Sequence, residues 1–347
     1  MLENIFVDAA NWLRNFLASI NLPVFAVDFV LLIVKLVAIL VFVLLNVMWL
    51  VYMERKVSAA FQCRIGPNRN GPFGLFQILY DVLKLISKEV ILPAHADKKL
   101  YLLGPLLIFI PPMAVFAIVP MGQGMASIDL NLGLYYFVAI ASINTILLWM
   151  AGWASNNKYS LLGGMRAVAQ MVSYEIPLLL ALVGIVIVTG TLNINTIVDA
   201  QKGIWLIFLQ PLAFIIYFIS AMAESNRAPF DLVEGESEII SGPYTEYSGM
   251  GFAFFFLAEY ANLLVMAIMT TTLFLGGWLA PFGWTFIPSW IWFMLKVYLV
   301  IWVTMWIRWT FPRIRVDHLM EFAWKFLVPL AIVNILLTGL AKYFFGM

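Results

Sequence analysis

Long apolar segments recur along almost the whole of this 347-residue chain. A helix needs roughly 20 predominantly apolar residues to cross the hydrocarbon core of a bilayer. About eight segments of the sequence satisfy this requirement, which predicts an all-α integral membrane protein with about eight transmembrane helices. The segments comprise residues 27–52, 100–120, 134–154, 168–189, 203–223, 251–275, 288–309 and 322–345.

The composition supports the same fold class. Hydrophobic residues make up 63% of the chain and charged residues 11%, so a water-soluble domain would lack polar side chains to cover its surface. The net charge is +1 and no basic tract is present, which argues against a nucleic-acid partner. Neither an internal repeat nor a low-complexity linker is apparent. The sequence therefore predicts one integral membrane domain over residues 1–347.

The N-terminal segment 2–20 is shorter and mixes polar with apolar residues. This pattern is typical of an amphipathic helix that lies on the membrane surface. Asp8 and Arg14 interrupt the first 25 residues, so they lack the continuous apolar core of a cleavable signal. We expect the first transmembrane segment to direct insertion instead.

Lysine and arginine residues are concentrated in alternate connections between the predicted spans. Positively charged loops face the cytoplasm in most membrane proteins. With eight spans, this rule places both termini outside and the structured, charged loops on the inner face. These inner loops comprise residues 53–99, 155–167, 224–250 and 308–321.

Several kinds of chemistry are excluded by what the chain lacks. Cys63 is the only cysteine, so the chain cannot form an internal disulfide or ligate an iron–sulfur cluster through cysteines. His95 and His318 are too few for a carrier of several haems. The chain has neither a phosphate-binding loop nor a Gly-x-Gly-x-x-Gly motif after a strand. We expect no bound metal or cofactor, and any electron must arrive from another subunit.

The first inner loop combines turn residues with a short amphipathic helix. Glycines and prolines between residues 66 and 74 indicate a fixed, turn-rich segment. Apolar residues from 75 to 90 recur at helical spacing, with Asp81, Lys84 and Lys88 on one face. That face is a candidate for function, although a simple solvated stripe on a surface helix explains it equally well.

The third inner loop is dense in carboxylates beside a membrane. Neighbouring like charges raise carboxylate pKa values, so such groups titrate together, as a proton reservoir requires. An acidic loop can also neutralise a basic partner, and the two interpretations are compatible. The carboxylates are Glu224, Asp231, Glu234, Glu236, Glu238 and, farther along, Glu246.

Two acids fall inside predicted spans. Glu175 lies in the fourth and Glu259 in the sixth, where an ionised carboxylate costs on the order of 3 kcal/mol. Such a residue faces a partner or a wet cavity, and a proton relay is the natural hypothesis. Tyr174 and Tyr260 are adjacent and could extend a hydrogen-bonded path. The alternative is a structural ion pair with Lys296.

A cluster of arginines surrounds Pro312 in the last inner loop. Guanidinium groups at a membrane edge bind lipid phosphates, neighbouring subunits or nearby acids, here those of the first loop. The sequence does not distinguish these three possibilities. The arginines are Arg308, Arg313 and Arg315.

The inner loops, taken together, resemble the quinone-site membrane subunit of respiratory complex I, the proton-translocating NADH:quinone oxidoreductase. The similarity runs from about residue 35 to residue 329 and keeps the motifs in order on the same spans. The matching runs are 54–56 (Glu-Arg-Lys), 64–68 (Arg-Ile-Gly-Pro-Asn), 152–164, 223–238, 245–250 (Thr-Glu-Tyr-Ser-Gly-Met), 256–262 and 308–313.

The resemblance implies roles for individual residues. One set would line the quinone chamber, and a second would link that chamber to the hydrophilic axis of the membrane arm. The implied chamber residues are Glu54, Arg55, Arg64, Asp81, Arg227, Phe230, Asp231, Glu234, Glu236, Glu238, Arg313 and Arg315. The implied proton path comprises Tyr174, Glu175, Glu224, Glu246, Glu259 and Tyr260.

The resemblance also implies partners and a location. Peripheral-arm subunits would carry the flavin and the iron–sulfur clusters, and the last cluster would reduce a quinone substrate. Small membrane subunits and antiporter-like subunits would be lateral partners in the lipid bilayer. The expected location is a bacterial inner membrane rather than an organellar one.

Two departures from the family pattern leave the quinone type open, ubiquinone or menaquinone. Residues 77–81 read Gln-Ile-Leu-Tyr-Asp where many members have Gln-Pro-x-Ala-Asp, and Pro243 replaces an aromatic residue found in several members. Homologous subunits of energy-converting hydrogenases and of F420 or ferredoxin oxidoreductases remain alternatives. A stand-alone ion transporter would show an internal inverted repeat or helices broken at mid-membrane, and neither is evident in the sequence. Buried Glu175 and Glu259 argue against a passive anchor.

Overall fold

A computed structural model describes residues 5–19, 23–233, 235–284 and 286–345. Over these residues the chain is helical and contains no β-strand. This confirms the predicted all-α class. The helices are α1 Ile5–Ser19, α2 Val24–Phe61, α3 Gln77–Ser87, α4 Lys98–Phe116, α5 Gly133–Ala154, α6 Lys158–Thr189, α7 Ile194–Ala200, α8 Leu206–Leu209, α9 Pro211–Glu224, α10 Glu236–Ile239, α11 Gly249–Phe274, α12 Ser289–Thr310, α13 Val316–Glu321 and α14 Val328–Phe345.

Shorter helical turns complete the chain. Three of them are 3₁₀ turns, and a π-helical turn joins α13 to α14 so that the two form one continuous rod. The 3₁₀ turns are Pro72–Gly74, Gly242–Tyr244 and Pro281–Gly283, and the π-helical turn is Phe322–Leu327.

Seven helical segments in the described part of the chain are long and apolar enough to cross a membrane. They match seven of the eight predicted spans, although their ends differ. They are α2, α4, α5, α6, α11, α12 and the rod from Val316 to Phe344.

The fifth predicted span, 203–223, is interrupted. α8 ends at Leu209, Gln210 adopts φ −133° and ψ 60°, and Pro211 begins the 14-residue helix α9. Proline has no amide hydrogen and clashes with the preceding turn, so it starts a helix more readily than it continues one. The helix is therefore not continuous over the predicted span, because hydropathy does not detect the break.

Two helices are longer than hydropathy predicted. α2 continues to Phe61, so Glu54 and Arg55 lie on its last turns instead of in a loop. α6 begins at Lys158, where the Asn157 side chain caps it by accepting a hydrogen bond from the amide of Tyr159. Apolar windows find only the part of a helix inside the hydrocarbon, whereas the charged ends continue as helix beyond it.

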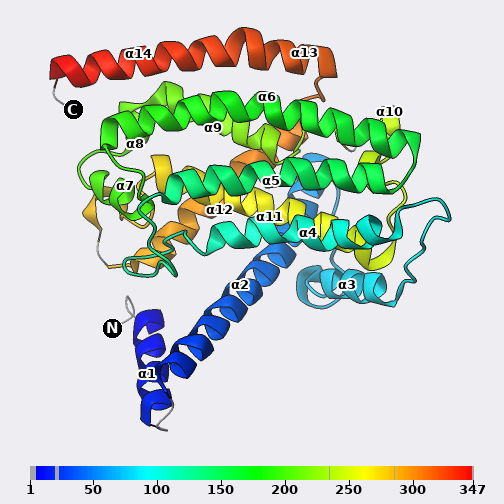
Figure 1. Cartoon of the computed structure of the whole chain (residues 1–347), viewed down its shortest axis with the longest axis horizontal. Coiled ribbons are helices and arrows are strands. Elements are labelled where there is room, and N and C mark those ends of the chain that lie inside the picture. The colour runs from blue at the N-terminus through cyan, green and yellow to red at the C-terminus, as the bar shows by residue number, and fades with distance from the viewer. Residues whose placement is uncertain (1–4, 20–22, 234, 285, 346–347) are drawn as a thin grey trace.

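The bundle is built around α11. In its most apolar stretch 61% of the residues are buried, against 11% for α2, so α11 is central and α2 peripheral. α4, α5 and α6 lie side by side across one face, and α14 runs along the outer side of α6 (Figure 1). Large apolar side chains of α11, α9 and α12 fill the space between these layers.

The first half of α2 leaves the bundle, and α1 crosses its outer end at a steep angle (Figure 1). Arg14 of α1 and Asp28 of α2 form an exposed ion pair at 3.5 Å. The predicted N-terminal helix is thus present over residues 5–19. The remaining ends of the 2–20 segment lie outside the described residues, and the position of the helix on the membrane surface stays a prediction.

The two ends of the bundle carry different helices and loops. α3, α10 and the predicted inner loops gather at one end, whereas α7, α8 and the end of α14 lie at the other (Figure 1). Almost all of the candidate chemistry therefore lies at a single end or just beneath it.

Candidate functional site

The loop after α9 carries the central residue of the site, Arg227. Gln170 of α6, fully buried, ties both ends of this loop to the bundle. Its side-chain amide donates to the carbonyl of Ala223 at 2.7 Å and to that of Phe230 at 2.6 Å. One amide from a neighbouring helix thus fixes where the loop leaves α9 and where it turns back.

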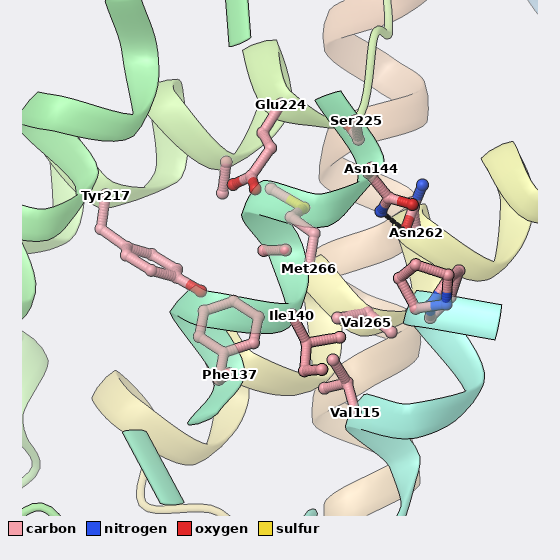
Figure 2. Close-up of a pocket in the computed structure, with 14 residues that line it drawn as sticks. Val115, Phe137, Ile140, Asn144, Tyr217, Glu224, Ser225, Asn262, Val265 and Met266 are labelled. Carbon is pink, nitrogen blue, oxygen red and sulfur yellow. Dashed lines mark hydrogen bonds between the residues drawn. The ribbon is translucent and has the colours of Figure 1, made fainter. Parts of the chain in front are cut away.

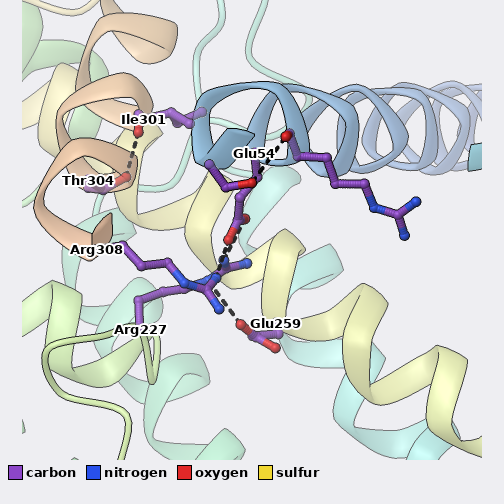
Figure 3. Close-up of polar contacts among 8 residues, drawn as sticks. Glu54, Arg227, Glu259, Ile301, Thr304 and Arg308 are labelled. Atoms are coloured by element: carbon purple, nitrogen blue, oxygen red, sulfur yellow. Dashed lines mark hydrogen bonds and ion pairs between the residues drawn. The ribbon is translucent and has the colours of Figure 1, made fainter. Parts of the chain in front are cut away.

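Arg227 lies between two carboxylates from different helices (Figure 3). Its Nη1 donates to Oε2 of Glu54 at 2.7 Å, and its Nε is 2.9 Å from Oε1 of Glu259. The guanidinium also lies over the ring of Tyr260, 4.1 Å from the centroid. Only 3% of the Arg227 side chain is exposed, so these contacts form in a medium where charges interact strongly.

A second guanidinium completes the cluster. Arg308, at the end of α12, forms an ion pair with Oε1 of Glu54, which therefore lies between two arginines. Two cations and two anions balance one another across α2, the α9–α10 loop, α11 and α12. Buried charges require such pairing, because an unpaired ion in the interior costs several kcal/mol. We call Glu54, Arg227, Glu259 and Arg308 the ionic cluster.

The carboxylates determine the charge state of Arg227. Burial alone would lower the pKa of its guanidinium, but the negative charges of Glu259 and Glu54 outweigh burial and raise that pKa above its ordinary value. Arg227 therefore stays charged at any physiological pH. The titratable members of the cluster are its carboxylates.

A separate ion pair links α2 to the short helix α3. Arg55 Nη1 is 2.5 Å from Oδ2 of Asp81, and Gln77 donates to the other oxygen of Asp81 at 3.2 Å. Lys84 of the same helix and Lys88, which directly follows it, are exposed, as expected for a solvated stripe. Arg64 is also exposed and donates to Gln62 at 2.6 Å.

The acidic loop is attached to the bundle at several points. Phe230 is buried, with its ring 5.6 Å from that of Tyr174, and Glu238 forms an ion pair with Arg166 of α6. The hydrogen bond and charge of Arg166 lower the pKa of the Glu238 carboxyl. Asp231 is half-buried and contributes to the electrostatic environment of Glu259.

Arg313 packs against the backbone of the same loop. A Cβ at Gly235 would lie 2.5 Å from its Nη2, so a larger residue there would displace the guanidinium. Arg315 is exposed. Glu234 lies outside the described residues, and so does the side chain of Glu236.

Glu246 occupies a different place, beside the turn between α5 and α6. Asn157 donates to its Oε1 at 2.5 Å, and the hydroxyl of Tyr101 donates to its backbone carbonyl at 2.6 Å. The ring of Tyr101 stacks on that of Tyr247 at 4.2 Å. Glu246 thus anchors the loop before α11 to α4 and to the start of α6.

Two further carboxylates lie deeper in the bundle. Ser142 of α5 donates to Glu175 of α6, and Glu175 is close enough to Glu224 for their charges to interact. Tyr174, which is adjacent in sequence, points elsewhere, because its hydroxyl donates to the carbonyl of Leu319 at 3.0 Å. The deep acids therefore form a pair of their own.

Small cavities occupy the space between the deep acids and the ionic cluster. One, of about 30 Å³, is lined by Glu224, Tyr217 and a mostly apolar wall (Figure 2). Another, of about 20 Å³, is lined by Glu259. Each is large enough for a water molecule, which needs about 10–15 Å³ of such space. Carboxylates bordering such cavities can exchange protons through water.

Lys296 does not pair with any of these acids among the described residues. Its ammonium donates to the carbonyls of Leu275 at 2.6 Å, Gly277 at 3.0 Å and Leu279 at 2.6 Å, and lies over the ring of Trp205. These carbonyls follow the last turn of α11, which has no amides left to satisfy them. The proposed pairing of Glu259 with Lys296 is wrong, because Glu259 pairs with Arg227.

Comparison with known proteins assigns the chain to a family. A sequence model of the family described as NADH dehydrogenase matches residues 34–339. The chain belongs to the NADH dehydrogenase family. A relative from Carboxydothermus hydrogenoformans, named as a subunit of NADH-quinone oxidoreductase, is 56% identical over 345 residues, which cover 99% of this chain and 99% of the relative.

Two further members of the family carry the same name. The protein from Bacillus cytotoxicus is 49% identical over 99% of this chain and all of its own length. The protein from Dehalococcoides mccartyi is 49% identical over 89% of this chain and 86% of its own length. These matches confirm the resemblance that the inner loops indicated.

Several residues of the site carry no acidic or basic signal in the sequence. In the sequence, the only indication that they matter is that they are polar residues within apolar spans. These residues are Asn144, Asn262, Gln170 and Ser142. A buried amide inside a span needs a hydrogen-bonding partner, so each deserves the attention given to buried acids. Among the described residues, no group of three or more histidine, cysteine, aspartate or glutamate side chains is placed to hold a metal ion.

Proposed function

We propose that this chain is the membrane subunit of a proton-translocating NADH:quinone oxidoreductase that encloses the inner end of the quinone chamber. The relatives named for this enzyme match over nearly the whole chain. The observation that carries the proposal is the position of Arg227 between Glu54 and Glu259, directly below the charged loops. The chamber lining consists of the residues that the resemblance implied.

The proposed reaction adds two electrons and two protons to a quinone to give a quinol. The electrons come from an iron–sulfur cluster of a peripheral subunit, and the headgroup gains negative charge until it is protonated. Charged residues of this chain near the headgroup respond to that change. Arg55 with Asp81, and Arg227 with Glu54, supply pairs of opposite charge for this response.

The ionic cluster transmits the change inward. When the charge of the quinone headgroup changes near Glu54 and Arg227, the electrostatic interactions within the ionic cluster change. The proton affinity of Glu259 changes with them. Protons then move between Glu259 and Glu224 through the cavities that these acids line, and on to Glu175, which is near Glu224. From there they would reach antiporter-like subunits along the membrane arm.

The proposal includes partners and a location. Peripheral-arm subunits bind the charged end of the bundle and carry the flavin and the clusters, while this chain holds none. Small and antiporter-like membrane subunits and lipid cover its sides. The chain lies in a bacterial inner membrane with its charged end toward the cytoplasm and both termini outside.

The test separates the quinone step from earlier electron transfer. In the assembled complex, Asp231→Asn or Arg64→Gln should lower NADH:quinone reductase activity about tenfold or more, because each removes a charge beside the headgroup. NADH oxidation by an artificial acceptor that takes electrons upstream should not change. Lys202→Gln, at the opposite end of the bundle, serves as the control.

Equal loss of both activities in intact complex would contradict a role for these residues at the quinone step. Turnover of NADH by this chain alone would contradict the assignment as a subunit.

A further inference from the structure

The two cavities between the acids are separated by a pair of asparagines. Asn144 of α5 and Asn262 of α11 line both cavities, together with Ser225. Asn144 Nδ2 donates to Asn262 Oδ1 at 3.1 Å. Figure 2 shows this hydrogen bond on one side of the first cavity, with Tyr217 on the other.

The surroundings of the pair are polar but incompletely bonded. Asn144 is only 8% exposed, yet in the described part of the chain its Oδ1 has no hydrogen-bond partner, nor does the hydroxyl of Tyr217. Buried polar atoms that line a water-sized space are normally satisfied by water. Both groups therefore favour hydration of the cavity on the Glu224 side.

The position of the pair determines what it can do. Glu224 lines only the first cavity and Glu259 only the second, so the asparagines lie where the two spaces meet. Asn262 follows Glu259 by three residues on α11, so both side chains lie on the same face of that helix. A water chain that joins the acids through these two cavities passes this junction.

We propose that Asn144 and Asn262 form a non-titrating gate for proton transfer between Glu224 and Glu259. An amide both donates and accepts hydrogen bonds but does not take up a proton at physiological pH. While the two amides bond to each other, they separate the hydrated acids. When the pair opens, each amide orients water toward its own acid, and a proton passes from one carboxyl to the other carboxylate.

This inference rests on the proposed function, and it makes the asparagines positioning residues, since the protons are held by the acids. The reason for a gate is physical. A permanently connected pair of carboxylates would equilibrate whatever the state of the quinone. A hydrogen bond of ordinary strength can open in response to a change at Glu259, which adjoins the ionic cluster.

The test uses the assembled complex with matched substitutions. Asn144→Leu keeps the approximate size but removes every hydrogen bond, and should slow quinone reduction about tenfold and raise its solvent deuterium isotope effect. Asn144→Ser keeps a hydroxyl and leaves space for a further water, and should stay within about threefold of the native rate. Asn334→Leu is the control, a buried asparagine of α14 that lines neither cavity.

Glu224→Gln and Glu259→Gln are measured in parallel so that the two proposals can fail separately. If both glutamine variants are slow while Asn144→Leu is as fast as the native complex, the gate is overturned and the relay stands. If Asn144→Leu and Asn334→Leu lose activity equally, with an unchanged isotope effect, the pair is structural and the gate is also overturned. Fully active glutamine variants would overturn the relay itself.

Discussion

Two buried cations at opposite ends of the bundle show how differently a charge can be accommodated. Arg227 at the inner end pairs with Glu54 and Glu259, whereas Lys296 at the outer end is held by three backbone carbonyls. Both are almost completely buried. The partners of Arg227 can change their protonation, but carbonyls cannot. The first site can therefore respond to a nearby charge through its partners, while the second holds the end of α11 in place.

The surroundings reinforce this contrast. The ionic cluster lies between charged loops and a water-sized cavity that Glu259 lines. Lys296 lies against Trp205 and a turn of small residues, Gly276 and Gly277, at the end with little charge. A buried cation is therefore a weak sign of function by itself, and the nature of its partners is the stronger sign.

The largest effect is expected from removing Arg227. Arg227→Met leaves the carboxylates of Glu54 and Glu259 buried with less positive charge to balance them. Breaking a buried ion pair in this way destabilises a protein by about 3–5 kcal/mol. The complex should assemble poorly, and any intact fraction should lose quinone reductase activity. Blue native electrophoresis with in-gel activity measures both. Near-native assembly and rate would mean that the cluster is neither structurally nor functionally important.

A smaller and different loss is expected at Lys296. Lys296→Met leaves three carbonyls without their donor, at about 1–3 kcal/mol for each group that water does not reach. The melting temperature of the purified complex should fall, while the rate per intact complex stays native. A lowered rate in intact complex would remove the distinction drawn between the two cations.

The smallest effect is expected where the acidic loop is tied to α6. Glu238 is partly exposed, so Arg166→Gln should cost at most about 1 kcal/mol. The pKa of Glu238 is lower in the folded protein than in the unfolded chain. The pair therefore stabilises the folded protein at pH values above the ordinary carboxyl pKa, and this stabilisation is lost as the pH falls through the lowered pKa. Melting curves of variant and native complex should therefore converge in acid. A constant difference at every pH would contradict this.

The sequence predicted seven of the spans and the gathering of the charged loops at one end (Figure 1), because hydrophobic length and loop charge are set by local composition. It did not predict the break before Pro211 or the continuation of α2 through Glu54, since both depend on backbone geometry rather than on hydropathy. Proline in an apolar run was a visible warning. The charged continuation of α2 carried no comparable sign.

The site was predicted in part. The acids and arginines stand out by their charge, but their partners do not, because Glu54, Arg227 and Glu259 come from three distant segments that only the packing brings together. The same limit explains why Lys296 was considered as a partner of the buried acids. Neutral amides such as Asn144 were overlooked, since an asparagine in a span has a smaller insertion cost than an acid.

Proton transfer through Glu259 and the deep acids Glu224 and Glu175 is the central claim, and Glu175 and Glu259 test it most directly. The measurement is quinone reductase rate and proton pumping in reconstituted vesicles, normalised to intact complex. Glu175→Gln and Glu259→Gln should assemble but lose both activities together, because tightly coupled steps stall together. The aspartate variants should retain more activity, since they keep a titratable group. Full rate and full pumping in both glutamine variants would contradict proton transfer through these residues.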